Sequence, residues 1–377
     1  NAAADASIYF ENEDLAFITY SVGGEIYVQE LNLNTWQVGK AGVALKLHSG
    51  IAAHARMYKK DGLYYLLVAE GSSMINAGLN MYRSEMATKN YQGCAYNPML
   101  SNRQMQNSSS IGHISTGDLI EAHNGEWWLA CQAKRIESGN EGLGFEMFLV
   151  PVSWPKGEFP VMAPGIGLLT NKYQIPGIAN ETNTLRKKES FDFSKGSLPL
   201  HWGSMCRNTE FIVPLQGKET RLLLQKEGLN TAQAPVFGPK ADNPNFSLTI
   251  KLRFKTAEAS EEGGLCLYVN KDNFVKMAIT ASGLQIMKTE NGLQTELLTT
   301  AYKHQAEHFL KIERLNYQLQ CSISTDGKSW RMLQAVDIKS FIAGQDAVVM
   351  PALYATSNGA ESKNFVQVFT AEYVSFQ

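Results

Sequence analysis

The chain has 377 residues, a net charge of −2 and 19% charged residues. That length is enough for two or three domains, each with a core of its own. No basic stripe suggests a nucleic-acid-binding surface, and no apolar stretch approaches the roughly 18 residues of a membrane helix. We therefore expect neither nucleic acid nor a membrane as a partner.

The chain shows no signal-peptide core, so we expect it to be cytosolic or already processed. A periplasmic or secreted location is slightly favoured over a cytoplasmic one. The cysteines are odd in number and contain no CxxC pair, which argues against a zinc site and against a disulfide framework. We expect most of them to be small buried hydrophobic residues: Cys94, Cys131, Cys206, Cys266 and Cys321.

Short strands separated by Gly, Asn and Asp turns follow one another in the first half, which is typical of an all-β protein. Three segments share the order strand, polar turn, aromatic strand, with turns near Asn12, Asp61 and Asn124. In the second of them, Asp61-Gly62 supplies the positive φ angles that a two-residue hairpin turn needs. Repeats of about 40–50 residues, each with a few strands, predict the blades of a β-propeller.

A polar segment with a Pro-Gly turn and a basic run, residues 171–188, predicts a linker. Beyond it, apolar and polar residues alternate along several strands, which predicts a β-sandwich. We therefore expect a partial propeller domain over residues 1–170 and a sandwich domain over residues 189–377.

Several segments, taken in chain order, are similar to a known family. HARMYKKDGLYYLLVAEG, TGDLIEAHNGEWWLA and LGFEMFLVPVSW resemble glycoside hydrolase family 43, in particular its β-xylosidase and α-L-arabinofuranosidase group. GGLCLYVNKDNFV and SISTDGKSW resemble the concanavalin-A-like β-sandwich that follows the propeller of those β-xylosidases. The resemblance implies an all-β fold, a five-bladed β-propeller with about three blades represented, followed by that sandwich.

Members of this family invert the anomeric centre with an Asp base, a Glu acid and a second Asp that adjusts the acid's pKa. The resemblance places Asp5, in the stretch DASIYF, at the pKa-adjusting position. The alternative for Asp5 is a turn cap at the start of a strand. The family's acid stands five residues before the tyrosine of the second hairpin, and Ala53 occupies that position here. The base cannot be placed in this sequence.

Two more positions depart from the family pattern. Thr116 stands where the family has an axial His, and His113 is either a substitute for it or a loop histidine. Phe145 stands where the family has an Arg that contacts the acid and the sugar, and an apolar ring cannot hold a carboxylate as Arg does. The retained neighbours Asp118 and Glu146 are candidate substrate contacts. Loss of the Glu, the His and the Arg predicts decayed or repurposed catalysis, with Glu70 and Glu146 as replacement acids if activity survives.

In the predicted sandwich, Phe237 either closes the sugar pocket or belongs to the core or rim. The resemblance implies an oligosaccharide partner and no cofactor or catalytic metal, while a structural calcium or sodium ion is left open. An open ring would expose strand edges, so we expect a further N-terminal segment or a second chain to complete the propeller.

Three functions are compatible with these residues. The first is an inverting glycosidase of the β-xylosidase or α-L-arabinofuranosidase type, impaired in catalysis, that acts on xylo- or arabino-oligosaccharides of the plant cell wall. The second is a non-catalytic carbohydrate-binding relative, and the third is an orphan fragment. Fold alone does not choose between them.

Overall fold

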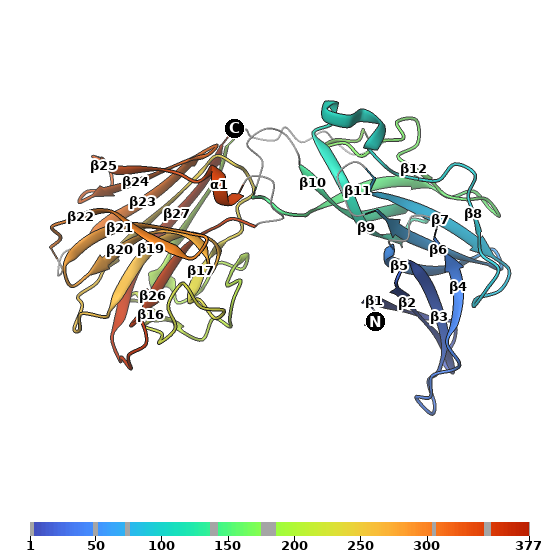
Figure 1. Cartoon of the computed structure of the whole chain (residues 1–377), viewed down its shortest axis with the longest axis horizontal. Helices are drawn as coiled ribbons and strands as arrows, with labels where there is room; N and C mark the ends of the chain where they lie inside the picture. Colours follow the sequence, from blue (N-terminus) through green and yellow to red (C-terminus); the bar gives the residue numbers. More distant parts are fainter. Residues whose placement is uncertain are drawn as a thin grey trace. The chain divides into compact units, whose positions relative to one another are not determined.

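The computed structural model describes residues 4–47, 52–71, 76–135, 142–174, 186–303, 307–342 and 348–376. The chain divides into two compact units, which are Asn1–Glu137 with Phe145–Asn180, and Ser138–Gly144 with Glu181–Gln377 (Figure 1). Within the described ranges the fold is almost entirely β, and none of the helices has the length and hydropathy needed to cross a bilayer.

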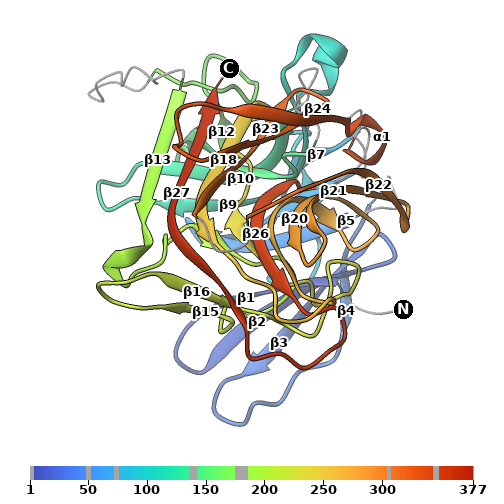
Figure 2. The ribbon, with the colours of Figure 1, turned by 90° about the vertical axis from the view of Figure 1, so that its left-hand side faces the viewer.

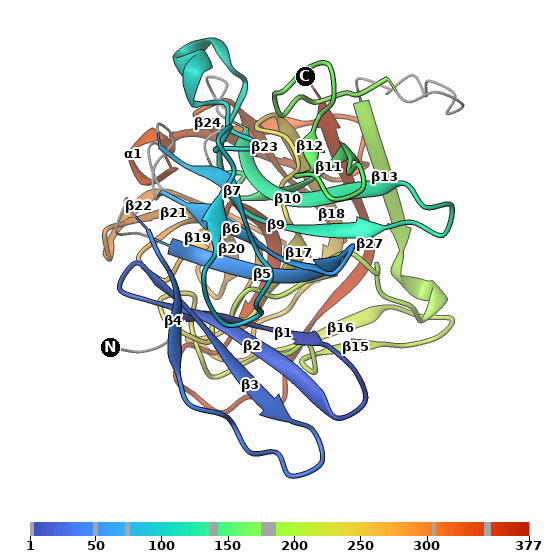
Figure 3. The same cartoon turned by 90° about the vertical axis from the view of Figure 1, so that its right-hand side faces the viewer.

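The first unit contains three four-stranded antiparallel sheets in its described residues (Figure 3). The sheets are β1 (Ala4–Phe10), β2 (Leu15–Val22), β3 (Glu25–Asn32) and β4 (Gly42–Lys46); β5 (Ala52–Lys60), β6 (Leu63–Glu70), β7 (Gly78–Ser84) and β8 (Gln92–Gly93); and β9 (Ile111–Glu121), β10 (Trp127–Arg135), β11 (Glu146–Ser153) and β12 (Val161–Met162). A 3₁₀ helix, η1 (Arg103–Ser108), precedes the third sheet. In each sheet the strands follow chain order, which is the organisation of propeller blades.

The three hairpins expected from the sequence are the first hairpin of each sheet, namely β1–β2, β5–β6 and β9–β10. In the second, Asp61 and Gly62 have φ angles of 52° and 81°. Two successive positive φ angles define the type I′ turn, whose twist matches that of the flanking strands. The hairpin prediction is therefore confirmed in its turn chemistry as well as in its position.

Strand β6 shows why the three sheets stack. Its alternating side chains enter two different cores: Leu66 and Val68 pack in the cluster that includes Phe17 of the first sheet, and Tyr65 and Leu67 pack in the cluster of the third sheet. The middle sheet is thus covered on both faces, which explains its nearly continuous apolar sequence.

The two outer sheets each leave apolar side chains exposed. Ile8 and Phe10 of β1 are 47% and 61% exposed, and Met147 and Leu149 of β11 are 64% and 56% exposed. Side chains alternate along a strand, so Ile8 lies on the face opposite to Ser7, whose hydroxyl binds the second sheet. The total number of blades, and the segment expected to complete the ring, stay predictions.

The second unit is a sandwich of two antiparallel sheets (Figures 1 and 2). One sheet contains β13 (Arg186–Asp192), β15 (Ile212–Pro214), β16 (Thr220–Leu223), β18 (Phe246–Arg253), β23 (His308–Leu315), β24 (Gln318–Ser324), β25 (Arg331–Asp337) and β27 (Phe365–Phe376). The other contains β14 (Trp202–Gly203), β17 (Val236–Pro239), β26 (Met350–Thr356), β19 (Glu262–Asn270), β20 (Asn273–Thr280), β21 (Gly283–Glu290) and β22 (Leu293–Thr300). Short helices are η2 (Phe193–Lys195) and α1 (Lys339–Ile342).

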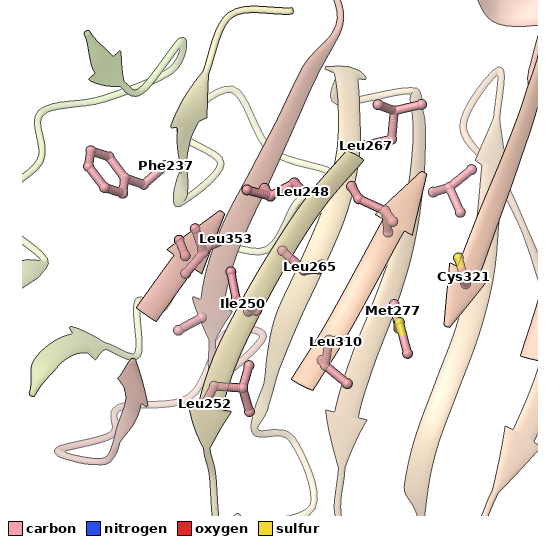
Figure 4. Packing of buried hydrophobic residues seen from close by; sticks show 14 of the residues in the cluster. Phe237, Leu248, Ile250, Leu252, Leu265, Leu267, Met277, Leu310, Cys321 and Leu353 are labelled. Atoms are coloured by element: carbon pink, nitrogen blue, oxygen red, sulfur yellow. The ribbon is translucent and has the colours of Figure 1, made fainter. Parts of the chain in front are cut away.

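Apolar side chains from the facing sides of the two sheets fill the sandwich, among them Leu248 and Ile250 of β18 and Leu265 and Met277 of the opposite sheet (Figure 4). This is the alternation that the sequence predicted for the second half. Four of the five cysteines are buried and all five are free thiols, as the cysteine count indicated.

The observed units differ from the predicted boundaries in two places. Residues 138–144 group with the sandwich, where Leu143 is 1% exposed and forms a bridge with Val348. Strand β13 begins at Arg186, inside the predicted linker, because its backbone pairs with β27. Neither long-range pairing has a signal in the local sequence.

Candidate functional site

Each first strand of the three sheets carries a β-bulge near its start. On β1, Asp5 and Ala6 lie opposite Tyr20 alone; on β5, Ala53 is the extra residue between Ala52 and His54; on β9, residues 113–115 lie opposite Ala133. Bulges re-aim side chains and are enriched beside active sites. Because β5 lies beside both β1 and β9, the bulges mark the starts of these strands as the candidate site (Figure 3).

The backbone at two of the bulges has an unusual conformation. Asp5 and His113 have φ angles of 55° and 51°. Positive φ is uncommon for residues other than glycine, although Asp, Asn and His adopt it more readily than most. Such conformations persist where the surrounding structure fixes them, and they often occur at ligand sites.

Asp5 and His54 come together across the first two sheets. An Asp5 carboxylate oxygen lies 3.5 Å from His54 Nδ1, and the two side chains are 39% and 27% exposed. Burial lowers the pKa of His54, the Asp5 carboxylate acts against this, and Arg56 adds to the lowering. The two strands are held in place next to this pair because Ser7 and Thr19 both donate hydrogen bonds to the carbonyl of Ala55.

We expect the substitution Asp5→Asn to lower the pKa of His54 further, because it removes the carboxylate that favours the imidazolium form. Asn keeps the positive φ accessible, so the backbone is preserved. Because the pKa of His54 is lower in the folded state than in the unfolded state, protonation of His54 favours unfolding. The stability of the folded state is therefore lost as the pH falls below about 6.5. Titration of the imidazole protons by NMR measures the shift. The variant Asp14→Asn, in the turn between β1 and β2, is the control. An unchanged His54 titration in Asp5→Asn would show that the pair does not interact.

Arg56 shares a strand face with His54 and Tyr58, since alternate residues of β5 point the same way. Its Nη1 atom is buried and has no hydrogen-bond partner among the described residues. A buried guanidinium nitrogen without a partner is costly, so it is a donor available to a ligand. Arg56 was not among the predicted site residues, because the alternation of His54, Arg56 and Tyr58 with Ala55 and Met57 indicates only that the three share a strand face.

Tyr58 links the second sheet to the third. Its hydroxyl donates to the carboxylate of Asp118 and accepts from the backbone N–H of Leu119 at 2.9 Å. Burial and then the Asp118 charge raise the pKa of Tyr58 well above its ordinary value. Asp118, a predicted substrate contact, is exposed. Its carboxylate already accepts a hydrogen bond from Tyr58, the side chain that joins the two sheets.

Phe145 directly precedes β11 of the third sheet, and its ring contacts that of His113. The two rings meet edge to face with centroids 5.0 Å apart, and Lys134 Nζ lies 4.5 Å from the centre of the Phe145 ring. Burial and then Lys134 lower the pKa of His113, and burial also lowers the pKa of Lys134. Thr116, three residues after His113, is half-buried and pairs with Gln132. An aromatic ring, an imidazole with a lowered pKa and the amine of Lys134 therefore occupy this part of the site.

The two carboxylates considered as replacement acids both have partners. Glu146 receives two hydrogen bonds from Arg135, at 2.6 and 2.8 Å, in a bidentate pair. Glu70 accepts from Asn80 at 2.5 Å and from the hydroxyl of Tyr82, whose pKa is raised by burial and then by Glu70. Glu70 pairs in the ladder with Ala52, so its backbone is next to the bulge at Ala53.

No cluster of three or more His, Cys, Asp or Glu side chains that could hold a metal ion occurs in the described ranges. The groups gathered at the strand starts are instead a carboxylate, a guanidinium, imidazoles and an aromatic ring. Such a set suits hydrogen bonding to hydroxyl groups and stacking, the two ordinary means of binding a sugar.

Comparison with protein families agrees with this reading. Residues 1–160 match the model of glycosyl hydrolases family 43, and residues 190–374 match the model of the beta xylosidase C-terminal concanavalin A-like domain. Apart from residues 138–144, the two matches lie one in each unit, and together they extend over most of the chain. The chain belongs to glycoside hydrolase family 43.

Curated relatives in family 43 are similar over nearly the whole chain. A xylosidase/arabinosidase of Butyrivibrio fibrisolvens is 25% identical over 408 residues, covering 98% of this chain and 76% of the relative. A non-reducing end alpha-L-arabinofuranosidase of Bacteroides ovatus, BoGH43B, is 24% identical over 380 residues, covering 97% and 70%. The chain is therefore a relative of xylosidases and arabinofuranosidases.

Solved structures confirm the fold. The family 43 protein BlXynB from Bacillus licheniformis has a TM-score of 0.83 at 21% identity, covering 100% of this chain and 75% of its own. The GH43B protein of the Bacteroides ovatus xyloglucan locus has the same score and identity, covering 99% and 76%. At this identity the likeness supports the propeller-type fold and the sandwich.

Three of the positions implied by the family 43 resemblance lie at the bulged strand starts or contact a residue of one of them. Asp5 lies at the β1 bulge in contact with His54, Ala53 forms the β5 bulge, and Phe145 contacts His113. The bulges were missed because an excess of one or two residues on one strand depends on the register of the partner strand, which the local sequence does not encode.

Phe237 is not in this group. It is 2% exposed and packs in the sandwich core, where its ring lies 5.6 Å from that of Trp202 (Figure 4). Of the two interpretations left open by the sequence, the core one holds, and the proposed contact with a sugar is corrected. Trp127 and Trp154 likewise pack against each other in the first unit, with centroids 4.8 Å apart.

Proposed function

We propose that this family 43 chain binds xylo- or arabino-oligosaccharides of the plant cell wall at the starts of β1, β5 and β9. The names of its relatives, a xylosidase/arabinosidase and an alpha-L-arabinofuranosidase, support the pentose class. The observation that carries the proposal is the buried, unpartnered Nη1 of Arg56, two residues from His54, which contacts Asp5. A sugar hydroxyl can accept a hydrogen bond from that donor.

Hydrolysis is proposed to be impaired in this chain. An inverting enzyme of the β-xylosidase or α-L-arabinofuranosidase type needs an acid and a base roughly 6.5–9.5 Å apart, with water between. The resemblance puts Ala53 at the acid position and Phe145 at the position of the family's Arg. The chemistry needs no cofactor, since carboxylates and water suffice.

The substitution Arg56→Met tests the binding site. A hydrogen bond to a charged donor contributes about 1.5–3 kcal/mol, so we expect affinity for xylotriose or arabinotriose to fall roughly 10- to 100-fold in calorimetric titrations. Arg103→Met, which removes an exposed guanidinium from η1, is the matched control. Equal affinities in Arg56→Met and in the unmodified chain would remove Arg56 from the site and leave the proposal without its main support.

A further inference from the structure

The sandwich has a cavity of its own on the face of its seven-stranded sheet that points away from the sandwich core. Phe274 of β20, Thr289 of β21 and Gln294 of β22 lie in a row across three neighbouring strands. Figure 2 labels these three strands in the second unit. Directly opposed residues of antiparallel strands point to the same face, so these three side chains share one side. The core of the sandwich takes the intervening residues, such as Val275 and Met277.

Two loops complete the cavity. Leu229 and Asn230 come from the segment before β17, and Asn358 comes from the turn after β26. The cavity volume is about 250 Å³. Pockets for drug-sized ligands have roughly 300–1,000 Å³, so this cavity suits one small ring rather than a chain segment.

The cavity is electrically neutral. Its two charged residues, Lys276 and Glu262, form an ion pair with both carboxylate oxygens 2.7 Å from Nζ, and their side chains are 9% and 7% exposed. The other lining side chains are uncharged: Leu229, Asn230, Phe274, Thr289, Gln294 and Asn358. A charged ligand would lack a counter-charge here, so the chemistry favours a neutral one.

One buried polar group in the cavity has no partner. Thr289 is 2% exposed, lines the cavity, and its hydroxyl makes no hydrogen bond within the described residues. Buried hydroxyls are nearly always satisfied, so an unsatisfied one calls for a ligand group. Thr, Asn and Gln side chains both donate and accept, as required by a molecule with several hydroxyl groups.

We propose that this cavity binds a single neutral sugar residue, separately from the site on the first unit. The Thr289 hydroxyl, the Gln294 amide and the Asn230 amide make hydrogen bonds to its hydroxyls, and Phe274 supplies an apolar wall. Such a site would hold the chain on a polysaccharide without taking part in chemistry. The evidence for this second site comes from the residues that line the cavity. Only the choice of pentoses as probes rests on the proposed function.

The test uses the whole chain, with D-xylose and L-arabinose as probes observed by ligand NMR and calorimetry. Thr289→Val is isosteric and removes only the unpartnered hydroxyl, so the variant should melt no earlier than the unmodified chain. Gln294→Ala is a second variant from an exposed position. The matched control is Gln285→Ala on neighbouring β21, whose side chain lies on the same sheet face but does not line the cavity.

In the Arg56→Met background, in which the first site is weakened, we expect the remaining affinity for D-xylose to fall about tenfold on adding Thr289→Val or Gln294→Ala, and to stay within twofold on adding Gln285→Ala. Equal affinity in all variants, no sugar binding at all, or binding that Arg56→Met abolishes would overturn the second site. Displacement of the sugar by acetate or phosphate would overturn its neutral character. D-xylose binding that depends on Thr289, together with a xylotriose affinity that Arg56→Met leaves unchanged, would reject the proposed function while this site stands.

Discussion

The unmodified chain will hydrolyse aryl β-xylosides and α-L-arabinofuranosides at least about 10²–10⁴-fold more slowly than a family 43 enzyme that has its general acid. That factor is the ordinary contribution of a positioned proton donor. Loss of an electrostatic group at Phe145 can cost about 10²–10³-fold on its own, although the two effects share one site and do not simply multiply. Rates with 4-nitrophenyl glycosides and with xylobiose measure the deficit.

The contribution of the acid can be measured apart from that of the base with the variant Ala53→Glu, assayed in the presence of sodium azide. Azide attacks the anomeric carbon in place of base-activated water, and the introduced carboxyl gives its proton to the departing oxygen. We expect glycosyl azide to form about 10²-fold faster than with Ala53→Gln, which has the same shape and no acidic proton. Family-typical turnover by the unmodified chain would contradict the assignment of Ala53, and Glu70→Gln would then be the next variant to assay.

The second large effect concerns stability. The substitution Lys276→Met should lower the free energy of unfolding by about 3–5 kcal/mol, because it leaves the Glu262 carboxylate buried without its partner. In a unit of this size that loss corresponds to a decrease in melting temperature on the order of 10 °C. Thermal unfolding followed by near-UV circular dichroism measures it.

Two further variants show whether the loss comes from an uncompensated charge. Lys276→Met combined with Glu262→Leu removes both charges and should recover most of the stability. Lys271→Met breaks an ion pair with Asp272 whose side chains are 53% and 48% exposed, and we expect less than about 1 kcal/mol. A double variant as unstable as Lys276→Met would indicate that packing, and not charge, holds this region.

The elements of the fold were predictable where the chemistry is local. The Asp61-Gly62 turn needs positive φ at two successive residues, and few sequences other than Asp-Gly or Asn-Gly provide it. The alternating strands of the second half carried their own signal, and the sandwich follows from it. The insertion of Leu143 beside Val348 had no such signal, because more than 200 residues separate the two positions.

The site was predictable only in part. The family pattern led to Asp5 and Phe145, and both lie beside the bulged strand starts. Arg56 was missed because a single arginine on a strand reads as a solvated side chain unless its burial is known. Phe237 was considered because of its place in the family pattern, but its burial depends on Trp202, with which it packs in the sandwich core.

The sandwich is discontinuous in the sequence, since residues 138–144 belong to it while residues 145–180 belong to the other unit. A gene fragment that starts at the C-terminal domain would therefore produce a sandwich without Leu143, a core residue that is 1% exposed. Gly142 also packs closely against the sandwich, since its φ is 89° and a Cβ there would lie 2.4 Å from the Val349 side chain. A fragment without Gly142 and Leu143 would therefore lack a closely packed part of the domain. Exchange of sandwiches between family members thus requires two matched segments to be transferred together, which makes this domain harder to shuffle than one that is contiguous in sequence.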